Sequence, residues 1–220
     1  AGHTLTVNRS SSNKPFDHDG VIDSGSDLNV TITNTGAQQD GLLLDATPNG
    51  GASTGNINDL TINMANGTAA NKTIGIADTL TLDGDLTITS GTFDTVFSGG
   101  SSQTLTVTGQ VSVTGTLTCN ESAINIGSLY ITSNGVVNAT NQTTTINKET
   151  SVSAVGYAVY NEGTFHHNNG LVVIGTDTST IVYGMEGDDT SGANSNAFYR
   201  VQVELDNAAY FCKFRPQAGT

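Results

Sequence analysis

The 220-residue sequence predicts an all-β protein, a parallel β-helix (β-solenoid) whose irregular rungs hold roughly 18–25 residues. One alternation of apolar and polar residues returns along the chain, and its copies carry a glycine in the same place. The composition agrees, because 26 residues are glycine and only 12% are charged. Small hydroxyl and amide side chains then supply the polarity, which suits pleated strands and tight turns. The alternative is a β-sandwich, which also has many short strands between turn signals.

The repeat is clearest in "TLTLDGDLTITSGTF" (79–93) and "TLTVTGQVSVTGTL" (104–117). Their apolar positions are 25 residues apart, and a third copy follows in "INIGSLYITSNGVV" (124–137) after a shorter step. A sandwich has no reason to keep one frame, whereas stacked rungs turn it into vertical columns of inward side chains. The predicted core columns contain Leu80, Leu82, Leu86, Ile88, Leu105, Val107, Val111, Val113, Ile124, Ile126, Leu129 and Ile131.

Glycines fall between the two apolar pairs of each copy, at Gly84, Gly109 and Gly127. A corner between two short strands can require a positive φ, which glycine adopts at little cost. We therefore predict that these three glycines are corner residues, with a positive φ at Gly109.

Weaker copies of the alternation extend the prediction along the whole chain, in four segments. We expect N-terminal irregular rungs over 1–57, regular rungs over 58–174, an excursion loop over 175–197, and final strands over 198–220 that continue into a further segment. In the last segment Val201 and Val203 are expected to face inward, while Arg200, Gln202 and Glu204 form the opposite, polar face.

Charge excludes some classes of partner. The net charge is −13 and the seven Lys and Arg residues are scattered, so neither nucleic-acid binding nor docking on an anionic membrane is expected. The chain begins in mid-pattern and has no apolar run, which predicts no signal peptide or membrane span, and a processed product or a piece of something longer. Cys119 and Cys212 are 93 positions apart and read as buried thiols, with a disulfide as the alternative.

Three stretches carry a family resemblance: "LTVTGQVSVTGTLTCNESAINIGSLYITSNG" (105–135), "GTFHHNNGLVVIGT" (163–176) and "FYRVQVELDN" (198–207). They resemble repeat segments of large β-helical structural proteins of bacteriophage virions, and are similar to repeats of bacterial adhesins. The resemblance covers roughly 58–207. It implies a virion surface protein and no catalytic residue.

Candidate chemistry is sparse. Glu186, Asp188 and Asp189 offer hard oxygen ligands and are weak candidates for Ca²⁺, as is the D-x-D-G stretch that starts at Asp17. His166 and His167 are adjacent, so on one strand they would point to opposite faces and could not chelate one metal. Apart from Ca²⁺, no cofactor is expected.

An enzyme is not expected either. Asp83 and Asp85 could share one outer face, but the next copy has Thr108 and Gln110 there, so no carboxylate pair converges across rungs. Together with the resemblance, which implies a virion surface protein, the sequence predicts a structural protein of the virion surface (fibre, spike or capsid decoration). Expected partners are copies of the same chain in a homotrimer, other virion proteins and a host-surface glycan. The alternatives are a bacterial surface adhesin and, third, a polysaccharide depolymerase.

Overall fold

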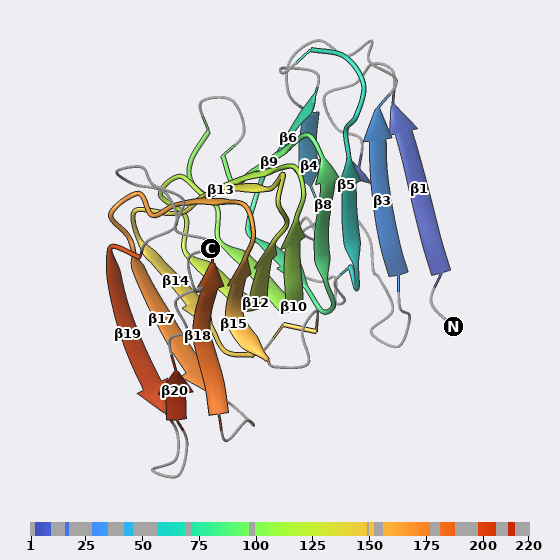
Figure 1. Cartoon of the computed structure of the whole chain (residues 1–220). Helices are drawn as coiled ribbons and strands as arrows, with labels where there is room; N and C mark the ends of the chain where they lie inside the picture. Colours follow the sequence, from blue (N-terminus) through green and yellow to red (C-terminus); the bar gives the residue numbers. More distant parts are fainter. Residues whose placement is uncertain are drawn as a thin grey trace, which may run out of the picture.

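The chain forms an all-β parallel solenoid, as the sequence predicts, in the computed structural model of Figure 1. Every pairing between described strands is parallel. The β-sandwich alternative is therefore wrong, because its sheets are antiparallel. The structure describes residues 3–9, 16–17, 28–34, 42–45, 57–68, 72–96, 100–148, 150–151, 156–176, 181–187, 198–205 and 211–213.

The described strands form two sheets. The larger sheet, called sheet A, has β1 at one end and β19 at the other. Its strands are β1 (His3–Arg9), β3 (Leu28–Asn34), β5 (Leu60–Asn63), β7 (Leu80–Leu82), β8 (Leu86–Ser90), β10 (Leu105–Val113), β12 (Ile124–Ile131), β14 (Thr143–Ile146), β15 (Tyr157–Asn161), β17 (Leu171–Thr176), β18 (Ile181–Gly187), β19 (Arg200–Leu205) and β20 (Phe211–Lys213).

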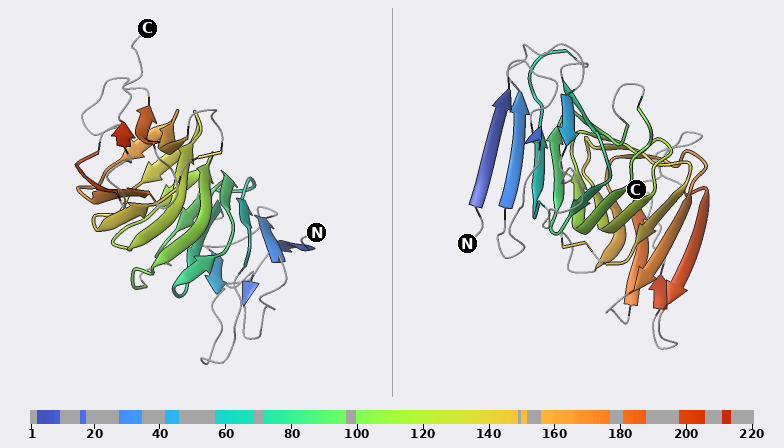
Figure 2. Two further views of the ribbon diagram at one scale, coloured as in Figure 1. Left: turned by 90° about the horizontal axis from the view of Figure 1, so that it is seen from below. Right: turned by 180° about the vertical axis from the view of Figure 1, so that it is seen from behind.

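The smaller sheet, sheet B, lies behind sheet A in Figure 1, and Figure 2 shows it from two further sides. Its strands are β2 (Phe16–Asp17), β4 (Leu42–Asp45), β6 (Thr73–Ile76), β9 (Thr92–Asp94), β11 (Thr116–Thr118), β13 (Val136–Asn138) and β16 (Thr164–His166). In the regular part the chain visits the sheets in turn, from β8 to β9, β10, β11, β12 and β13. One rung is thus a long stretch in sheet A followed by a short strand in sheet B. No helix in the described segments is long and apolar enough to cross a membrane.

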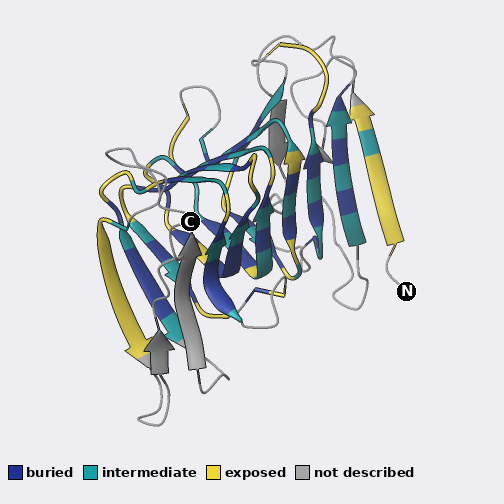
Figure 3. Ribbon diagram, in the orientation of Figure 1, coloured by how far each residue is buried: buried dark blue, intermediate teal, exposed yellow. Residues whose placement is uncertain are grey.

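The predicted inward columns are confirmed. Leu80, Leu105 and Ile124 are direct register partners on successive strands. Each is at most 2% exposed, and all twelve predicted column residues are at most 4% exposed. Because side chains alternate between the two faces of a strand, intervening threonines such as Thr81, Thr87 and Thr106 point outward, whereas Ser128, beside the register shift in β12, is buried. Figure 3 shows the resulting stripes of buried and intermediate positions.

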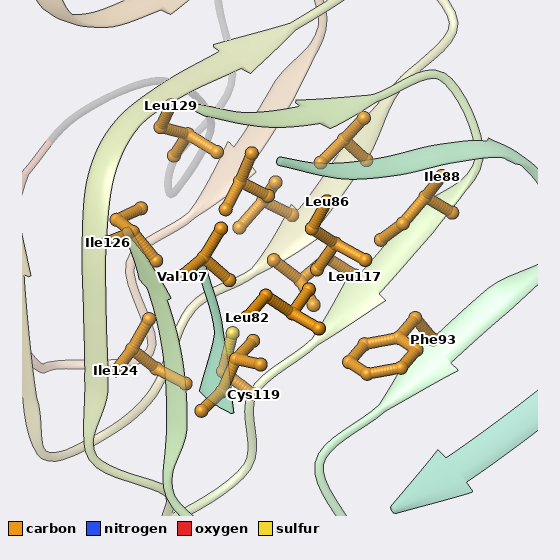
Figure 4. Packing of buried hydrophobic residues seen from close by; sticks show 14 of the residues in the cluster. Leu82, Leu86, Ile88, Phe93, Val107, Leu117, Cys119, Ile124, Ile126 and Leu129 are labelled. Carbon is orange, nitrogen blue, oxygen red and sulfur yellow. The ribbon is translucent and has the colours of Figure 1, made fainter. Parts of the chain in front are cut away.

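Sheet B completes the core from the other side. Phe93, Leu117 and Val137 are register partners that are at most 2% exposed. Figure 4 shows Phe93 and Leu117 facing the aliphatic columns of sheet A. Burying each such side chain contributes about 1.5–3 kcal/mol to stability, so the stack of rungs has one continuous apolar core.

The predicted glycine positions line up, but the reason given for them is wrong. Gly109 lies inside β10 and Gly127 inside β12, where the register shifts, and neither has a positive φ. The glycines are needed for close approach instead. A Cβ on Gly109 would lie 2.7 Å from the carbonyl oxygen of Gly84, and a Cβ on Gly127 would lie 2.6 Å from that of Thr108. Gly84, Gly109 and Gly127 therefore form a column in which neighbouring backbones touch, called the glycine column below.

Rung length varies more than predicted. Register partners differ by 18 residues between Val111 and Leu129, but by 30 between Leu129 and Val159. Longer turns between strands account for the larger steps, since the strands themselves keep one frame. The segment 175–197 also departs from the prediction, because part of it, β18, is a strand that pairs with β15 and β20.

The last described strands leave apolar side chains uncovered. Val201 and Val203 continue the columns of Val172 and Ile174, as expected for inward residues, yet they are 37% and 38% exposed. At the opposite end Leu5 on β1 is 43% exposed. Figure 3 shows both end strands as exposed, because no described strand stacks beyond them.

Cys119 is a buried free thiol, as predicted. Burial, with the charge of Asp94 as the smaller cause, raises the pKa of this thiol to about 12. Next to it the buried Thr95 hydroxyl donates to the Cys119 carbonyl oxygen over 2.8 Å and accepts from the Ser122 hydroxyl over 2.7 Å. Cys212 lies in β20 opposite Val182, and its side chain is outside the described part.

Candidate functional site: an asparagine–histidine pocket

A pocket lined by polar side chains follows the end of sheet B. His166 is the last residue of β16 and is the register partner of Asn138 on β13, one rung earlier. The chain then turns through a short polar segment before β17. The resulting pocket has a volume of about 410 Å³ and is lined by Asn138, His166, His167, Asn168 and Asn169. This set is called the asparagine–histidine pocket below.

The turn that shapes the pocket has a fixed backbone. Asn168 and Asn169 have φ of 45° and 62°, the left-handed region that Asn tolerates better than most residues. The backbone N–H of Asn169 donates to Nδ1 of His167 over 2.9 Å, and the backbone N–H of Gly170 donates to the His167 carbonyl oxygen over 3.0 Å. Gly170 packs directly on the Thr140 backbone, where a Cβ would overlap the carbonyl oxygen. Local hydrogen bonds and a glycine contact thus hold the turn.

The hydrogen bond from the Asn169 backbone also fixes which nitrogen of the His167 ring accepts and which donates. A nitrogen that accepts a hydrogen bond carries no proton, so Nδ1 is the acceptor and Nε2 is left as the donor. Asn side chains supply one acceptor oxygen and two donor hydrogens each. The lining can therefore both donate and accept hydrogen bonds, and none of the described residues that form it is a carboxylate.

An aromatic ring stands beside the pocket. Tyr199, just before β19, stacks on the His167 ring with centroids 5.4 Å apart and an interplanar angle of 22°, and it remains 57% exposed. The Arg200 guanidinium lies 5.8 Å from the Tyr199 ring centroid and donates to the Asn169 carbonyl oxygen over 3.4 Å. The start of β19 is thereby tied to the turn.

A second polar cluster lies on the outer face of sheet A. Tyr130 and Tyr160 are register partners whose ring centroids are 5.6 Å apart. Their hydroxyls donate to the two carboxylate oxygens of Glu162, over 3.0 Å and 3.4 Å respectively. Burial, followed by the hydrogen bond and charge of Glu162, raises the pKa of Tyr130. Both carboxylate oxygens of Glu162 accept from the tyrosine hydroxyls, so we interpret this cluster as a contact that stabilises two neighbouring rungs.

The remaining predicted candidates do not gather into a site. Glu186 lies in β18 as the register partner of Tyr160, whereas Asp188 and Asp189 lie outside the described residues. Asp17 is in β2, and the rest of its D-x-D-G stretch is also outside the described part. Within the described ranges no three His, Cys, Asp or Glu side chains are grouped closely enough to hold a metal ion.

The prediction for the histidine pair needs a correction. His166 and His167 both line the pocket, because the strand ends at His166 and strict alternation of faces ends with it.

Of the paired aspartates, Asp85 accepts the Gln110 backbone amide over 2.7 Å at its Oδ1. Asp59 does the same for the Asp85 amide over 2.8 Å, so carboxylates at this bend connect successive rungs.

Sequence reasoning missed the role of Asn168, Asn169 and Tyr199. The signal that could have found the two asparagines is "HHNNG", a turn sequence directly after a strand.

Comparison with protein family models, with curated proteins and with solved structures gives no match to this chain.

Proposed function

We propose that the chain is a structural and attachment protein of the virion surface, as part of a bacteriophage fibre, spike or capsid decoration. The observation that carries the proposal is the stack itself. The path β1–β3–β5–β8–β10–β12–β15–β18–β20 has nine strands in one continuous parallel ladder, which at about 4.8 Å per strand makes a body about 40 Å long. Each rung is fixed by the rung before it and the rung after it, so such a body is stiff along its axis.

The uncovered apolar side chains support assembly with other chains. Val201 and Val203 lie in columns that are otherwise buried, and an open edge strand also presents unpaired backbone groups. A fibre or spike places such ends against further protein. We therefore propose that the partners are copies of the same chain, in a homotrimer, and other virion proteins. The location that follows is extracellular, on the particle surface.

The proposal is tested by mass spectrometry of purified virus particles from the source of the sequence, together with the mass of the isolated protein by light scattering. We expect peptides of this chain in intact particles and an oligomer in solution. Peptides found only in a bacterial envelope fraction would overturn the virion assignment in favour of an adhesin. A stable monomer that cleaves a polysaccharide would overturn the structural function itself.

A further inference from the structure

We propose that the asparagine–histidine pocket binds a neutral saccharide, with Tyr199 as the surface on which one sugar ring rests. The inference rests on the proposed attachment function, because it names the class of ligand to which the chain would attach. Three features of the described residues support it: the hydrogen-bonding lining, the exposed ring beside it and the rigidity of the turn.

The lining matches a ligand that is covered with hydroxyl groups. Each sugar hydroxyl both donates and accepts a hydrogen bond, and the lining offers both functions: the side-chain amides of Asn138, Asn168 and Asn169 supply acceptor oxygens and donor hydrogens, and His167 supplies a donor at Nε2. A lining with only donors or only acceptors would leave either the donor or the acceptor function of each hydroxyl unpaired, which costs free energy once water is excluded. The volume of about 410 Å³ lies within the range of pockets that enclose small ligands, and one or two sugar rings would fill it.

Tyr199 provides the apolar part of the recognition. Sugar rings have one face lined by C–H groups, and such a face packs flat on an aromatic ring. Tyr199 is 57% exposed although its ring is stacked on His167 and the Arg200 guanidinium lies 5.8 Å from the ring centroid, so a large part of this side chain stays accessible to a ligand. An exposed aromatic ring anchored in this way is typical of binding surfaces, since it loses little side-chain entropy when a ligand packs on it.

Charge favours a neutral ligand over an acidic one. The chain carries a net charge of −13, so a polyanionic glycan would be repelled over most of the surface. Arg200, a cation beside the pocket, already lies over Tyr199 and donates to the Asn169 carbonyl oxygen. It therefore orders the site and is not directed at a ligand carboxylate.

The turn is ordered without a ligand. Asn168 and Asn169 hold left-handed backbone conformations, which cost free energy in non-glycine residues and are concentrated at functional sites. Glycine would adopt the same φ more cheaply, yet the turn carries two amide side chains that glycine lacks. This choice of residue is explained if the amides contact a ligand.

The turn also makes a clean test possible. Asn168→Gly and Asn169→Gly keep the positive φ and remove one amide each, so both variants should fold. Tyr199→Ala removes an exposed ring. The matched control is Asn125→Ala, which removes an exposed amide from the outer face of sheet A, on β12. Thermal unfolding of all four variants checks that the fold is intact.

Binding is measured on a printed array of neutral and acidic oligosaccharides, followed by saturation-transfer NMR with the strongest neutral probe and with 3′-sialyllactose as the acidic one. We expect binding to at least one neutral probe. Each Asn→Gly variant should lose about 3- to 10-fold in affinity, as for one hydrogen bond, and Tyr199→Ala should lose about 10-fold. Asn125→Ala should bind like the parent protein.

Three results would overturn the inference: no binding to any neutral probe, binding of acidic probes alone, or binding that the three pocket variants leave unchanged. None of these results concerns the virion assignment, which depends on particle mass spectrometry. A chain that is found in particles and binds no saccharide would keep the proposed function and lose only this pocket.

Discussion

Replacing Gly127 with alanine tests whether the glycine column exists for close backbone approach. An added Cβ would lie 2.6 Å from the Thr108 carbonyl oxygen and would also overlap that of Gly109. An ordinary contact begins at 3.4 Å, so the two rungs would have to separate locally by at least about 0.8 Å. Both neighbouring atoms belong to the backbone, so no side chain can rotate away to relieve the contact.

The cost can be estimated from what this separation disturbs. Forcing one methyl group into a packed site costs about 1–3 kcal/mol. The Gly127 carbonyl oxygen also accepts from the Lys148 amide over 2.7 Å and from the Asn147 amide over 3.2 Å, and weakening one such bond costs about 0.5–1.5 kcal/mol. Alanine recovers about 0.4–1 kcal/mol by restricting the unfolded chain. We expect Gly127→Ala to lower the free energy of unfolding by about 2 kcal/mol.

The assay is equilibrium urea unfolding followed by circular dichroism, with Gly175→Ala as the matched control. Gly175 is also on a sheet A strand, but a Cβ there has its nearest neighbour, the Glu204 carbonyl oxygen, at 3.8 Å. That variant should be as stable as the parent, or more stable by up to about 1 kcal/mol. If Gly127→Ala and Gly175→Ala unfold at the same urea concentration, the close-approach explanation is refuted.

Three further changes test other contacts of the core and the bend. Thr95→Val should lower the free energy of unfolding, measured in urea, by about 1–3 kcal/mol because the buried Ser122 hydroxyl loses its acceptor. The control Thr116→Val, on the outer face of sheet B, should change it by less than about 0.5 kcal/mol. Asp85→Ala should cost about 1 kcal/mol in melting experiments and Asp85→Asn much less, since only the asparagine keeps an oxygen for the Gln110 amide; equal losses would contradict this. Stability should fall as pH rises from about 9 toward 12. The Cys119 thiol ionises near its ordinary pKa of 9.0 in the unfolded chain, whereas in the folded protein it keeps its proton up to about 12. Urea titrations across this range should show a smaller fall for Cys119→Ala.

The repeat predicted from sequence is accurate where one frame is kept. Leu80, Leu105 and Ile124 could be placed in one column because the same order of apolar residues around a glycine, three or four residues after the first of them, favours a stacked arrangement. The reason for that glycine could not be predicted. A sequence shows that a side chain is absent, but it does not show whether φ or a neighbouring backbone requires the absence.

The candidate site was harder to predict than the core, and the reason is physical. The pocket combines a residue of β13 with the end of β16 and the turn after it, and Tyr199, just before β19, stacks beside it; these segments lie far apart in sequence and meet only because the rungs stack. His166 and His167 were assigned to opposite faces because an unbroken strand was assumed. A strand that ends one residue earlier changes the direction of the second ring, and boundaries of this kind are the least predictable part of a sequence reading.

The shared register of the rungs makes length an adjustable property of this protein. Because the same positions meet from one strand to the next, a duplicated rung would find partners already in place above and below it. Gain or loss of one copy would change the height of the body by about 4.8 Å and leave the chemistry of its interior unchanged. A lineage could thus set how far the asparagine–histidine pocket stands from the base of the stack by counting copies, without redesigning a single contact.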